Sequence, residues 1–499
     1  MSSFSPGDAG QSVPLSSRLR LQVGNQWQGT AVLGSPTSAV LGGEDGTEVT
    51  AGLSEFSAAE PPIVVEASRP PSAVLGEDEP QTAVLEYAPE ESAVYALMQV
   101  IETPDGLIYD FTLPLAGGDD GMVLGRGNTL RFPVNAIALD VAPAPGEPHS
   151  AVLGIEDLIG GAIGGAVGGA VVKRVLQVIK APFEKSILEA IRKTEGEPWV
   201  GMLGGDAQWK PFQGAETWRA ALKPATEQRV LLLVHGFGSS LAGSNEWLAA
   251  LGKQHGYDAV IGYNHPTIWC DPAHNAAAML ELIPEDMRLN VDIIAHSRGG
   301  LVSRSLVELV EPNDRINVGR IVTCGTPHGG TPLADPERWD RLVSIGMTAA
   351  SWLAASAGAA VMIPRVLEMV LKAASQIVFD LPGLGAMTPG GAYMTKLNSV
   401  SEVGSGFALA QGRARYSAVT SRFSVFSVDK PAFQQAFATF AAQAFFDKPN
   451  DLVVPTGSMT AIDDMGLVPR ERQLLVANDH FSYFRDRQVL DFIAARLGE

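Results

Sequence analysis

A serine at a predicted sharp turn is the strongest chemical feature of this sequence. The stretch Ala295–Gly300 reads Ala-His-Ser-Arg-Gly-Gly, and it lies between an apolar stretch typical of a buried strand, Val291–Ile294, and an apolar helical stretch, Leu301–Val310. At such a strand–turn–helix elbow the serine has a strained backbone, so the residues two positions before and after it must be small. An alanine and a glycine occupy these positions. We therefore predict that Ser297 is a nucleophile, against the alternative of a chance turn.

A second motif predicts where negative charge on the substrate would be stabilised. The stretch His235-Gly-Phe-Gly238 directly follows the apolar run Val230–Val234. In acyl transfer from a serine elbow, one backbone N–H comes from the loop after an early strand and another from the residue after the nucleophile. These residues are Phe237 and Arg298. We interpret His235 as a structural imidazole that fixes this loop.

A serine nucleophile also needs a base and an acid, which follow it in the order Asp then His at this type of elbow. Of the eight histidines, only His480 fits this order together with a position on a loop after a predicted strand. Asp451 precedes a short apolar turn and is the predicted acid. Four other aspartates compete with it, namely Asp447, Asp463, Asp464 and Asp479.

Taken together, these stretches resemble the lipases and serine esterases of the α/β-hydrolase family. The resemblance is carried by His235–Gly238, Ala295–Gly300, Gly325–Gly330 and Asn450–Pro455, followed by His480. It covers residues 196–499 and departs from the family's usual motif in having alanine at 295, which occurs in some lipases. It implies an α/β fold with a mostly parallel sheet, and ester cleavage through an acyl-enzyme without a metal or cofactor.

The elements that must position these residues alternate between strands and helices from about residue 229 onward. Uninterrupted apolar strands of this kind belong to parallel sheets covered by helices on both faces. We predict strands at Val230–Val234, Ala259–Gly262, Val291–Ala295, Arg320–Cys324 and Gln473–Ala477.

An insertion at about residues 336–404 interrupts this alternation. Its stretch Leu342–Ile363 contains 22 residues without a charge. We predict a helical lid that favours a lipid or another hydrophobic ester as substrate. The alternative is an ordinary pair of buried helices.

The first 195 residues divide into three predicted segments. Residues 1–89 read as an acidic, largely disordered segment, 90–150 as a small β-rich unit, and 151–195 as a glycine-rich helix followed by an amphipathic helix. Residues 1–150 hold 5 basic and 20 acidic residues. A Ser/Thr-Ala-Val-Leu-Gly motif begins at Thr30, Ser38, Ser72 and Ser150, with weaker copies at Thr82 and Ser92. These repeats predict docking of a protein partner or protease, or autoinhibition, with an unselected spacer as the alternative.

Composition limits the classes of partner and compartment. The chain of 499 residues has a formal net charge of −19, which argues against nucleic acid as a partner. Its two cysteines, Cys270 and Cys324, are too few for a disulfide framework or a four-ligand zinc site. The residues after Met1 lack the pattern of a secretory signal. We predict a cytoplasmic protein, with peripheral membrane contact as an addition.

An alternative function treats the chain as a membrane-active effector or a partner-docking protein. In that reading the N-terminal repeats or the glycine-rich stretch Leu158–Val172 carry the activity, and the hydrolase is an output or is degenerate. The stretch is 15 residues long, which is shorter than the roughly 20 residues that a spanning helix needs.

Overall fold

The structure is a computed structural model, and it divides the chain into two compact units. Unit 1 comprises Met1–Lys185, Trp339–Phe379 and Val428–Gln443, and unit 2 comprises Ser186–Arg338, Asp380–Ser427 and Ala444–Glu499. The structure describes residues 2–4, 11–23, 28–33, 57–68, 83–91, 93–103, 106–115, 129–134, 172–182, 192–193, 195–222, 228–241, 246–310, 315–335, 338–353, 381–399, 416–424, 433–434, 436–437, 440, 448–463 and 466–499.

Unit 2 is built on an eight-stranded sheet in the order β13-β12-β15-β14-β16-β17-β18-β21. The strands from β15 to β21 run parallel, and β12 and β13 are antiparallel additions at one edge. The mostly parallel sheet expected from the sequence is therefore present. The strands are β12 (Trp199–Leu203), β13 (Trp209–Pro211), β14 (Val230–Val234), β15 (Ala259–Asn264), β16 (Leu289–His296), β17 (Ile316–Cys324), β18 (Tyr416–Ser421) and β21 (Gln473–Val476).

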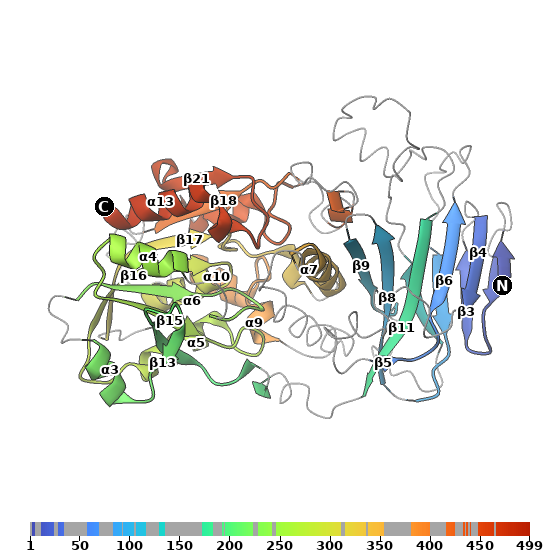
Figure 1. The fold of residues 1–499 in the computed structure, drawn as a ribbon, viewed down its shortest axis with the longest axis horizontal. Helices are drawn as coiled ribbons and strands as arrows, with labels where there is room; N and C mark the ends of the chain where they lie inside the picture. Colours follow the sequence, from blue (N-terminus) through green and yellow to red (C-terminus); the bar gives the residue numbers. More distant parts are fainter. Residues whose placement is uncertain are drawn as a thin grey trace. The chain divides into compact units, whose positions relative to one another are not determined.

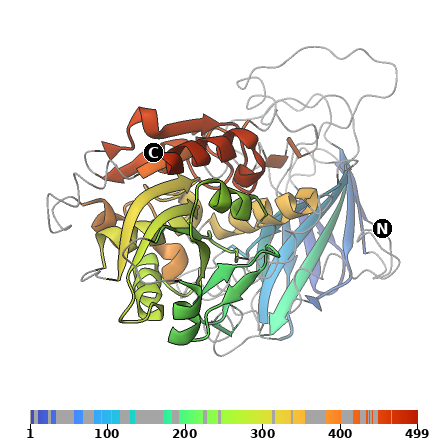
Figure 2. The same cartoon turned by 60° about the vertical axis from the view of Figure 1, so that its left-hand side comes forward.

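Helices cover both faces of this sheet, because the central strands are apolar on both sides. Alternate residues of β14, such as Leu232, pack in one core with α5 and α6, and the others, such as Leu231, pack with α4 and α13. Figure 1 shows these two helix layers, and Figure 2 shows the yellow strands β16 and β17 in the middle of the sheet. The helices are α3 (Ala215–Ala221), α4 (Glu246–Gln254), α5 (Pro272–Leu282), α6 (Gly299–Glu308), α9 (Pro382–Gly385), α10 (Ala392–Asn398) and α13 (Arg487–Gly498).

Short elements complete unit 2. They are the hairpin strands β19 (Ala461–Asp463) and β20 (Gly466–Leu467) and the 3₁₀ turns η2 (Pro332–Ala334), η6 (Thr456–Thr460), η7 (Arg470–Arg472) and η8 (Tyr483–Arg485). A search of the described helices, in both units, finds none that is long and apolar enough to cross a membrane.

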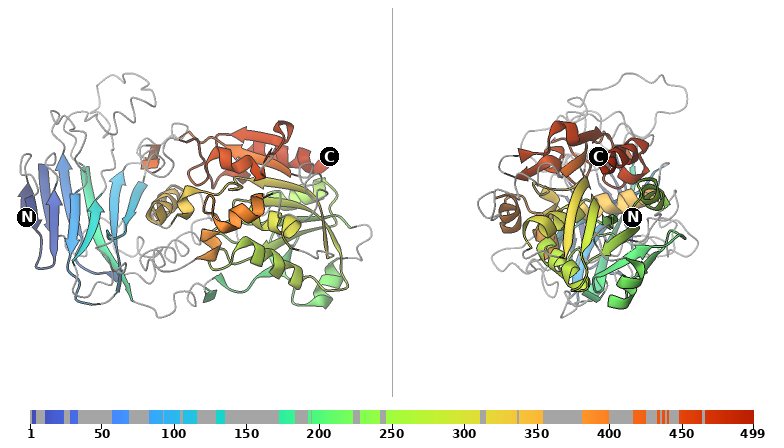
Figure 3. Two further views of the ribbon diagram at one scale, coloured as in Figure 1. Left: turned by 180° about the vertical axis from the view of Figure 1, so that it is seen from behind. Right: turned by 90° about the vertical axis from the view of Figure 1, so that its left-hand side faces the viewer.

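Unit 1 contains two β-sheets that share one apolar core. The larger sheet has the order β1-β4-β6-β11-β8-β9, with β5 also paired to β11, and the smaller has the order β10-β7-β3-β2. Figure 3 shows these strands from behind on its left side. The strands are β1 (Ser2–Phe4), β2 (Gln11–Pro14), β3 (Leu19–Val23), β4 (Gln28–Leu33), β5 (Ser57–Ala58), β6 (Ile63–Ser68), β7 (Ala83–Tyr87), β8 (Ala93–Thr103), β9 (Gly106–Thr112), β10 (Leu130–Val134) and β11 (Val172–Pro182).

The prediction that residues 1–89 are largely disordered is wrong for the part that the structure describes. The short apolar islands pair with strands far away in the sequence, so they bury one another in space. The repeat copies at Thr30, Thr82 and Ser92 lead into or lie within β4, β7 and β8. In β7 the residues Ala83, Leu85 and Tyr87 alternate into the core, as a half-buried strand requires. The copies at Ser38, Ser72 and Ser150 lie outside the described residues.

The predicted amphipathic helix that starts near Lys173 is also wrong at its beginning, because residues 172–182 form β11. This strand lies between β6 and β8, and Val175, Leu176, Val178 and Ile179 are all buried. A strand covered on both faces is uniformly apolar, so periodicity alone does not distinguish it from a helix. The glycine-rich stretch before it lies outside the described residues. Strands β8, β9 and β10 do form within residues 90–150, but they belong to the two sheets of unit 1.

The first part of the insertion belongs to unit 1. Helix α7 (Trp339–Leu353) packs against the edge strand β9, as Figure 1 shows. Ser344 and Thr348 accept hydrogen bonds from the backbone N–H groups of Phe111 and Tyr109, at 2.9 and 3.2 Å. Residues 354–380 lie outside the described residues, and α9 and α10 belong to unit 2. The lid therefore stays a prediction.

Candidate active site

Ser297 occupies the sharp turn that the sequence predicts. It lies between β16 and α6, and its φ of 53° is in the left-handed region that non-glycine residues rarely adopt. The small residues near it are required by close packing. A Cβ on Gly299 would lie 2.3 Å from the carbonyl oxygen of Val234, and a Cβ on Gly300 would lie 2.2 Å from Oγ1 of Thr326. The start of α6 therefore packs directly against β14 and the loop after β17.

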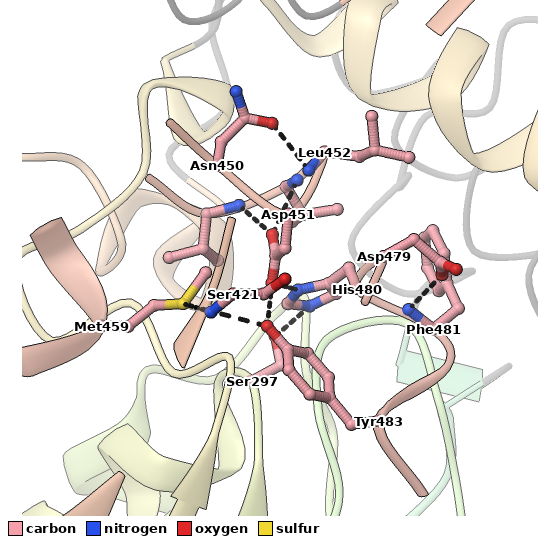
Figure 4. Close-up of polar contacts among 12 residues, drawn as sticks. Ser297, Ser421, Asn450, Asp451, Leu452, Met459, Asp479, His480, Phe481 and Tyr483 are labelled. Atoms are coloured by element: carbon pink, nitrogen blue, oxygen red, sulfur yellow. Dashed lines mark hydrogen bonds and ion pairs between the residues drawn. The ribbon is translucent and has the colours of Figure 1, made fainter. Parts of the chain in front are cut away.

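The structure brings Ser297, His480 and Asp451 into one hydrogen-bonded row, drawn in Figure 4. His480 follows β21, and its Nε2 lies 2.9 Å from Oγ of Ser297. Its Nδ1 lies 2.7 Å from Oδ2 of Asp451. Because a carboxylate only accepts, the Nδ1 atom carries the proton and the Nε2 atom of a neutral ring accepts from the serine hydroxyl. The three side chains are buried, with exposed fractions of 4% for Ser297, 4% for His480 and 0% for Asp451.

Asp451 is held by four hydrogen-bond donors. Its Oδ1 accepts from the backbone N–H groups of Val453 and Val454, at 3.0 and 2.7 Å. Its Oδ2 accepts from His480 and also from the hydroxyl of Tyr483, at 2.7 Å. Burial, followed by the charge of Asp451, raises the pKa of Tyr483 well above its usual value, so this hydroxyl keeps its proton. The sequence analysis missed Tyr483, whose only signal is its place three residues after His480.

The competing aspartates do not take this position where the structure describes them. The Oδ1 atom of Asp479 accepts from the N–H of Phe481 at 2.8 Å, and burial raises the pKa of this carboxyl. Asp463 lies in β19, and Asp447 and Asp464 lie outside the described residues.

The two predicted oxyanion donors are next to the serine and have free N–H groups. A Cβ on Gly236 would lie only 2.7 Å from Cβ of Ser297, so the loop that carries Phe237 runs directly past the nucleophile. Within the described part of the chain, the N–H groups of Phe237 and Arg298 donate to no protein acceptor. Two unpaired N–H groups beside a serine can bind a negatively charged oxygen.

His235 has the structural role that the sequence suggests. Its Nδ1 lies 3.0 Å from the carbonyl oxygen of Gly236, and its Nε2 accepts from the backbone N–H of His265 at 3.1 Å. Burial lowers the pKa of His235 to about 4 and that of His265 well below its usual value. Burial also lowers the pKa of His296 to about 3, and its Nε2 lies 2.9 Å from the carbonyl oxygen of His480. These three imidazoles are therefore neutral at pH 7.

Among the residues with described positions, no three His, Cys, Asp or Glu side chains are grouped so as to share a metal ion. Cys270 and Cys324 are free and buried, and burial raises the pKa of Cys270 to about 12.

Part of the chain is similar to solved structures of bacterial lipases and hydrolases. A lipase of Bacillus licheniformis in its mature form, BlEst2, is 17% identical with a TM-score of 0.35 and covers 60% of this chain and 97% of its own. Lipase 1 of Pelosinus fermentans is 14% identical with a TM-score of 0.36 and covers 54% and 97%. A hydrolase of Pseudomonas aeruginosa PA01 is 16% identical with a TM-score of 0.29 and covers 60% and 98%.

No curated protein matches the chain. One family model does match, over residues 200–498, and its description is Domain of unknown function (DUF7379). This match covers most of unit 2, with its serine elbow, His480 and Asp451, and more than half of the sequence. The chain therefore belongs to the family described as Domain of unknown function (DUF7379).

Proposed function

We propose that this protein is a serine hydrolase that cleaves carboxylic esters. The observation that carries the proposal is the row from Oγ of Ser297 through His480 to Asp451, with distances of 2.9 and 2.7 Å, beside two unpaired N–H groups. This arrangement supplies a nucleophile, a base and an orienting carboxylate in the order that acyl transfer needs.

The steps follow from these contacts. Ser297 attacks the ester carbonyl carbon while Nε2 of His480 takes the hydroxyl proton, and Asp451 stabilises the resulting imidazolium. The N–H groups of Phe237 and Arg298 bind the oxyanion, at about 3 kcal/mol per donor in comparable sites. The imidazolium then gives its proton to the leaving alcohol, and an acyl-enzyme remains. Water, deprotonated by His480, releases the acid and restores the serine.

Within this class we propose hydrophobic or lipid esters as substrates. The support is the uncharged stretch 342–363 in the insertion. Its first part is taken up by α7 in unit 1, and the remainder lies outside the described residues. The proposed preference for long acyl chains is therefore tested by comparing the hydrolysis rates of esters with different chain lengths.

The test is hydrolysis of 4-nitrophenyl esters from acetate to palmitate, and of phospholipid vesicles, by the full chain and by Ser297→Ala. We expect the full chain to hydrolyse esters, with higher kcat/KM for longer acyl chains, and Ser297→Ala to be inactive. Equal hydrolysis by the two proteins would contradict the mechanism. Highest activity on the acetate ester would contradict the hydrophobic substrate but not the mechanism.

A further inference from the structure

A half-buried carboxylate, that of Glu195, lies beside the loop after β15, and the catalytic steps above do not use it. The Oε1 atom of Glu195 accepts from the N–H and the hydroxyl of Thr267, at 2.6 and 2.7 Å. Both carboxylate oxygens also accept from the N–H of Ile268, at 3.1 and 3.0 Å. Burial raises the pKa of Glu195, and the hydrogen bonds from Thr267 act in the opposite direction. The Glu195 carboxylate thus holds the loop after β15 through the backbone N–H groups of Thr267 and Ile268.

The hydrogen bonds continue from this loop to the predicted oxyanion loop. The N–H of Gly238 donates to Oγ1 of Thr267 at 3.1 Å. A threonine hydroxyl has a single proton, so Thr267, which accepts from Gly238, directs that proton to Glu195. The result is a directional chain from the Gly238 N–H through the Thr267 hydroxyl to the Glu195 carboxylate. Thr267 is 1% exposed, so water does not replace a lost member of this chain easily.

This chain fixes the peptide that follows Phe237. The preceding peptide is held through the Gly236 carbonyl, which lies 3.0 Å from Nδ1 of His235 and 2.9 Å from Oγ of Ser239. The following peptide ends at Gly238, which adopts the left-handed region with a φ of 65° and, having no Cβ, has no side chain to restrict its backbone. The bond to Thr267 supplies that anchor.

The same loop also reaches the second oxyanion residue. The guanidinium of Arg298 donates to the carbonyl of Cys270 and, at 3.1 Å, to Oδ1 of Asn275. It also donates to the carbonyl of Gly383 at 3.2 Å, while the N–H of Gly383 donates to Ile268 at 2.8 Å. Contacts from one loop therefore lead to both residues whose N–H groups flank Ser297.

We propose that Glu195, acting through Thr267, is a positioning residue that sets the Phe237 N–H for the oxyanion. This inference rests on the proposed ester hydrolysis. Because the oxyanion forms only in the transition state, a displaced donor lowers kcat and leaves substrate binding nearly unchanged. A displacement of about 1 Å is enough to cost about 100-fold.

The test compares Thr267→Val, which removes the hydroxyl at nearly constant volume, with Thr267→Ser, which keeps it. Thr420→Val is the matched control, since Thr420 also loses a buried hydroxyl, which donates to the Leu474 carbonyl at 3.1 Å and to none of Ser297, His480 and Asp451. We expect Thr267→Val to lower kcat about 10-fold to 100-fold and to leave KM within about 2-fold of the wild type. Phenylboronic acid forms a tetrahedral adduct with the nucleophilic serine, and its inhibition should weaken by a factor similar to that in kcat. Thr267→Ser should stay within about 3-fold of the wild type. Thr420→Val should lower Tm and keep kcat.

Three outcomes would overturn the proposal. The first is an unchanged kcat in folded Thr267→Val, and the second is an equal loss in Thr267→Ser. The third is a rise in KM without a fall in kcat. If Thr267→Val does not fold, Glu195→Gln carries the same test, because an amide replaces one of the acceptor oxygens. Absence of ester hydrolysis by the wild type would overturn the proposed function itself, which distinguishes the two failures.

Discussion

The carboxylate of Asp451 has no lone pair to spare, because four donors converge on its two oxygens. An asparagine at this position turns its NH₂ group toward one of these donors, and two donors cannot hydrogen-bond to each other. Asp451→Asn therefore disturbs the orientation of His480 while leaving Ser297 in place. We expect kcat to fall about 10⁴-fold, which is less than the loss in Ser297→Ala. Steady-state kinetics with a nitrophenyl ester measure this.

The matched control for this change is Asp479→Asn, because Asp479 is also buried but bonds the N–H of Phe481 instead of His480. Its turnover should stay nearly intact. Greater damage in Asp479→Asn than in Asp451→Asn would show that the acid is misassigned.

Buried neutral histidines make stability depend on pH. The pKa of His235 is lowered to about 4 and that of His296 to about 3 by burial. Between pH 6.5 and 4 the unfolded chain therefore binds protons that the folded chain does not, so the free energy of unfolding falls as the pH drops through this window. His235 alone contributes about 3 kcal/mol to this fall by pH 4.

Urea unfolding at pH 7, 6 and 5 measures this slope. His296→Gln keeps a donor toward the His480 carbonyl but does not titrate, so its slope should be smaller than that of the wild type. His274→Gln, an exposed residue of α5, should leave the slope unchanged. Equal stability of the wild type at pH 7 and pH 5 would contradict the burial of these rings.

At the scale of elements, the serine elbow depends on close contact between α6 and β14. Gly299→Ala places a methyl group 2.3 Å from the Val234 carbonyl oxygen and 2.5 Å from that of His235, and backbone atoms do not move aside easily. We expect a loss of about 2 to 3 kcal/mol in stability and a fall in kcat of more than about 10-fold. Thermal unfolding and ester kinetics measure the two effects.

Gly205→Ala is the control for this substitution, because a Cβ there has no atom within 4 Å. It should unfold at nearly the wild-type temperature. A Gly299→Ala protein as stable and active as Gly205→Ala would show that α6 does not pack as described.

The elements that the sequence predicts best are those whose burial is local and uniform. Strands β14, β16 and β17 appear at their predicted places because each contains a short run of consecutive apolar residues, and Ser297 follows from the small residues around it. Strand β18, Tyr416–Ser421, was missed because four of its six residues carry hydroxyl groups. The strands of residues 1–89 were missed because their partners lie far away in the sequence, as where Ile63 pairs with Leu176. Glu195 and Thr267 were missed because neither belongs to a motif.

At the scale of the whole molecule, helix α7 of the insertion packs on strand β9 of unit 1. Arg341 lies 2.9 Å from Asp110, and the side chain of Asp110 is 1% exposed. Replacing Arg341 by methionine removes this ion pair while the Asp110 carboxylate stays buried. We expect unit 1 to lose about 3 kcal/mol or more of stability.

Differential scanning calorimetry with parallel ester kinetics measures this effect. The double variant Asp110→Asn/Arg341→Met should recover part of the loss, because it also removes the buried charge that Arg341 compensates. Short-chain ester kinetics of the folded protein should stay near wild type, since the site residues belong to unit 2. Unchanged unfolding in Arg341→Met would contradict the role of α7 in unit 1.

Three of the N-terminal repeat copies contribute to the sheets of unit 1. The copies at Thr30, Thr82 and Ser92 supply or precede strands of unit 1, so their apolar residues are used within the chain. Docking of a partner or protease at the copies beginning at Ser38, Ser72 and Ser150 stays a prediction, as does membrane contact. Peptides of these three copies can be tested for binding to the full chain. Binding would indicate self-association, and absence of binding would favour docking to another protein.

The most direct measurement is the site and rate of covalent labelling by a fluorophosphonate, read by mass spectrometry of the full chain and its peptides. Such a reagent reacts with a serine only when a base has activated its hydroxyl. We predict a single adduct on Ser297, absent in Ser297→Ala and formed at least about 100-fold more slowly in His480→Ala. An adduct on another residue, or equal labelling rates in the wild type and His480→Ala, would contradict Ser297 as the activated nucleophile.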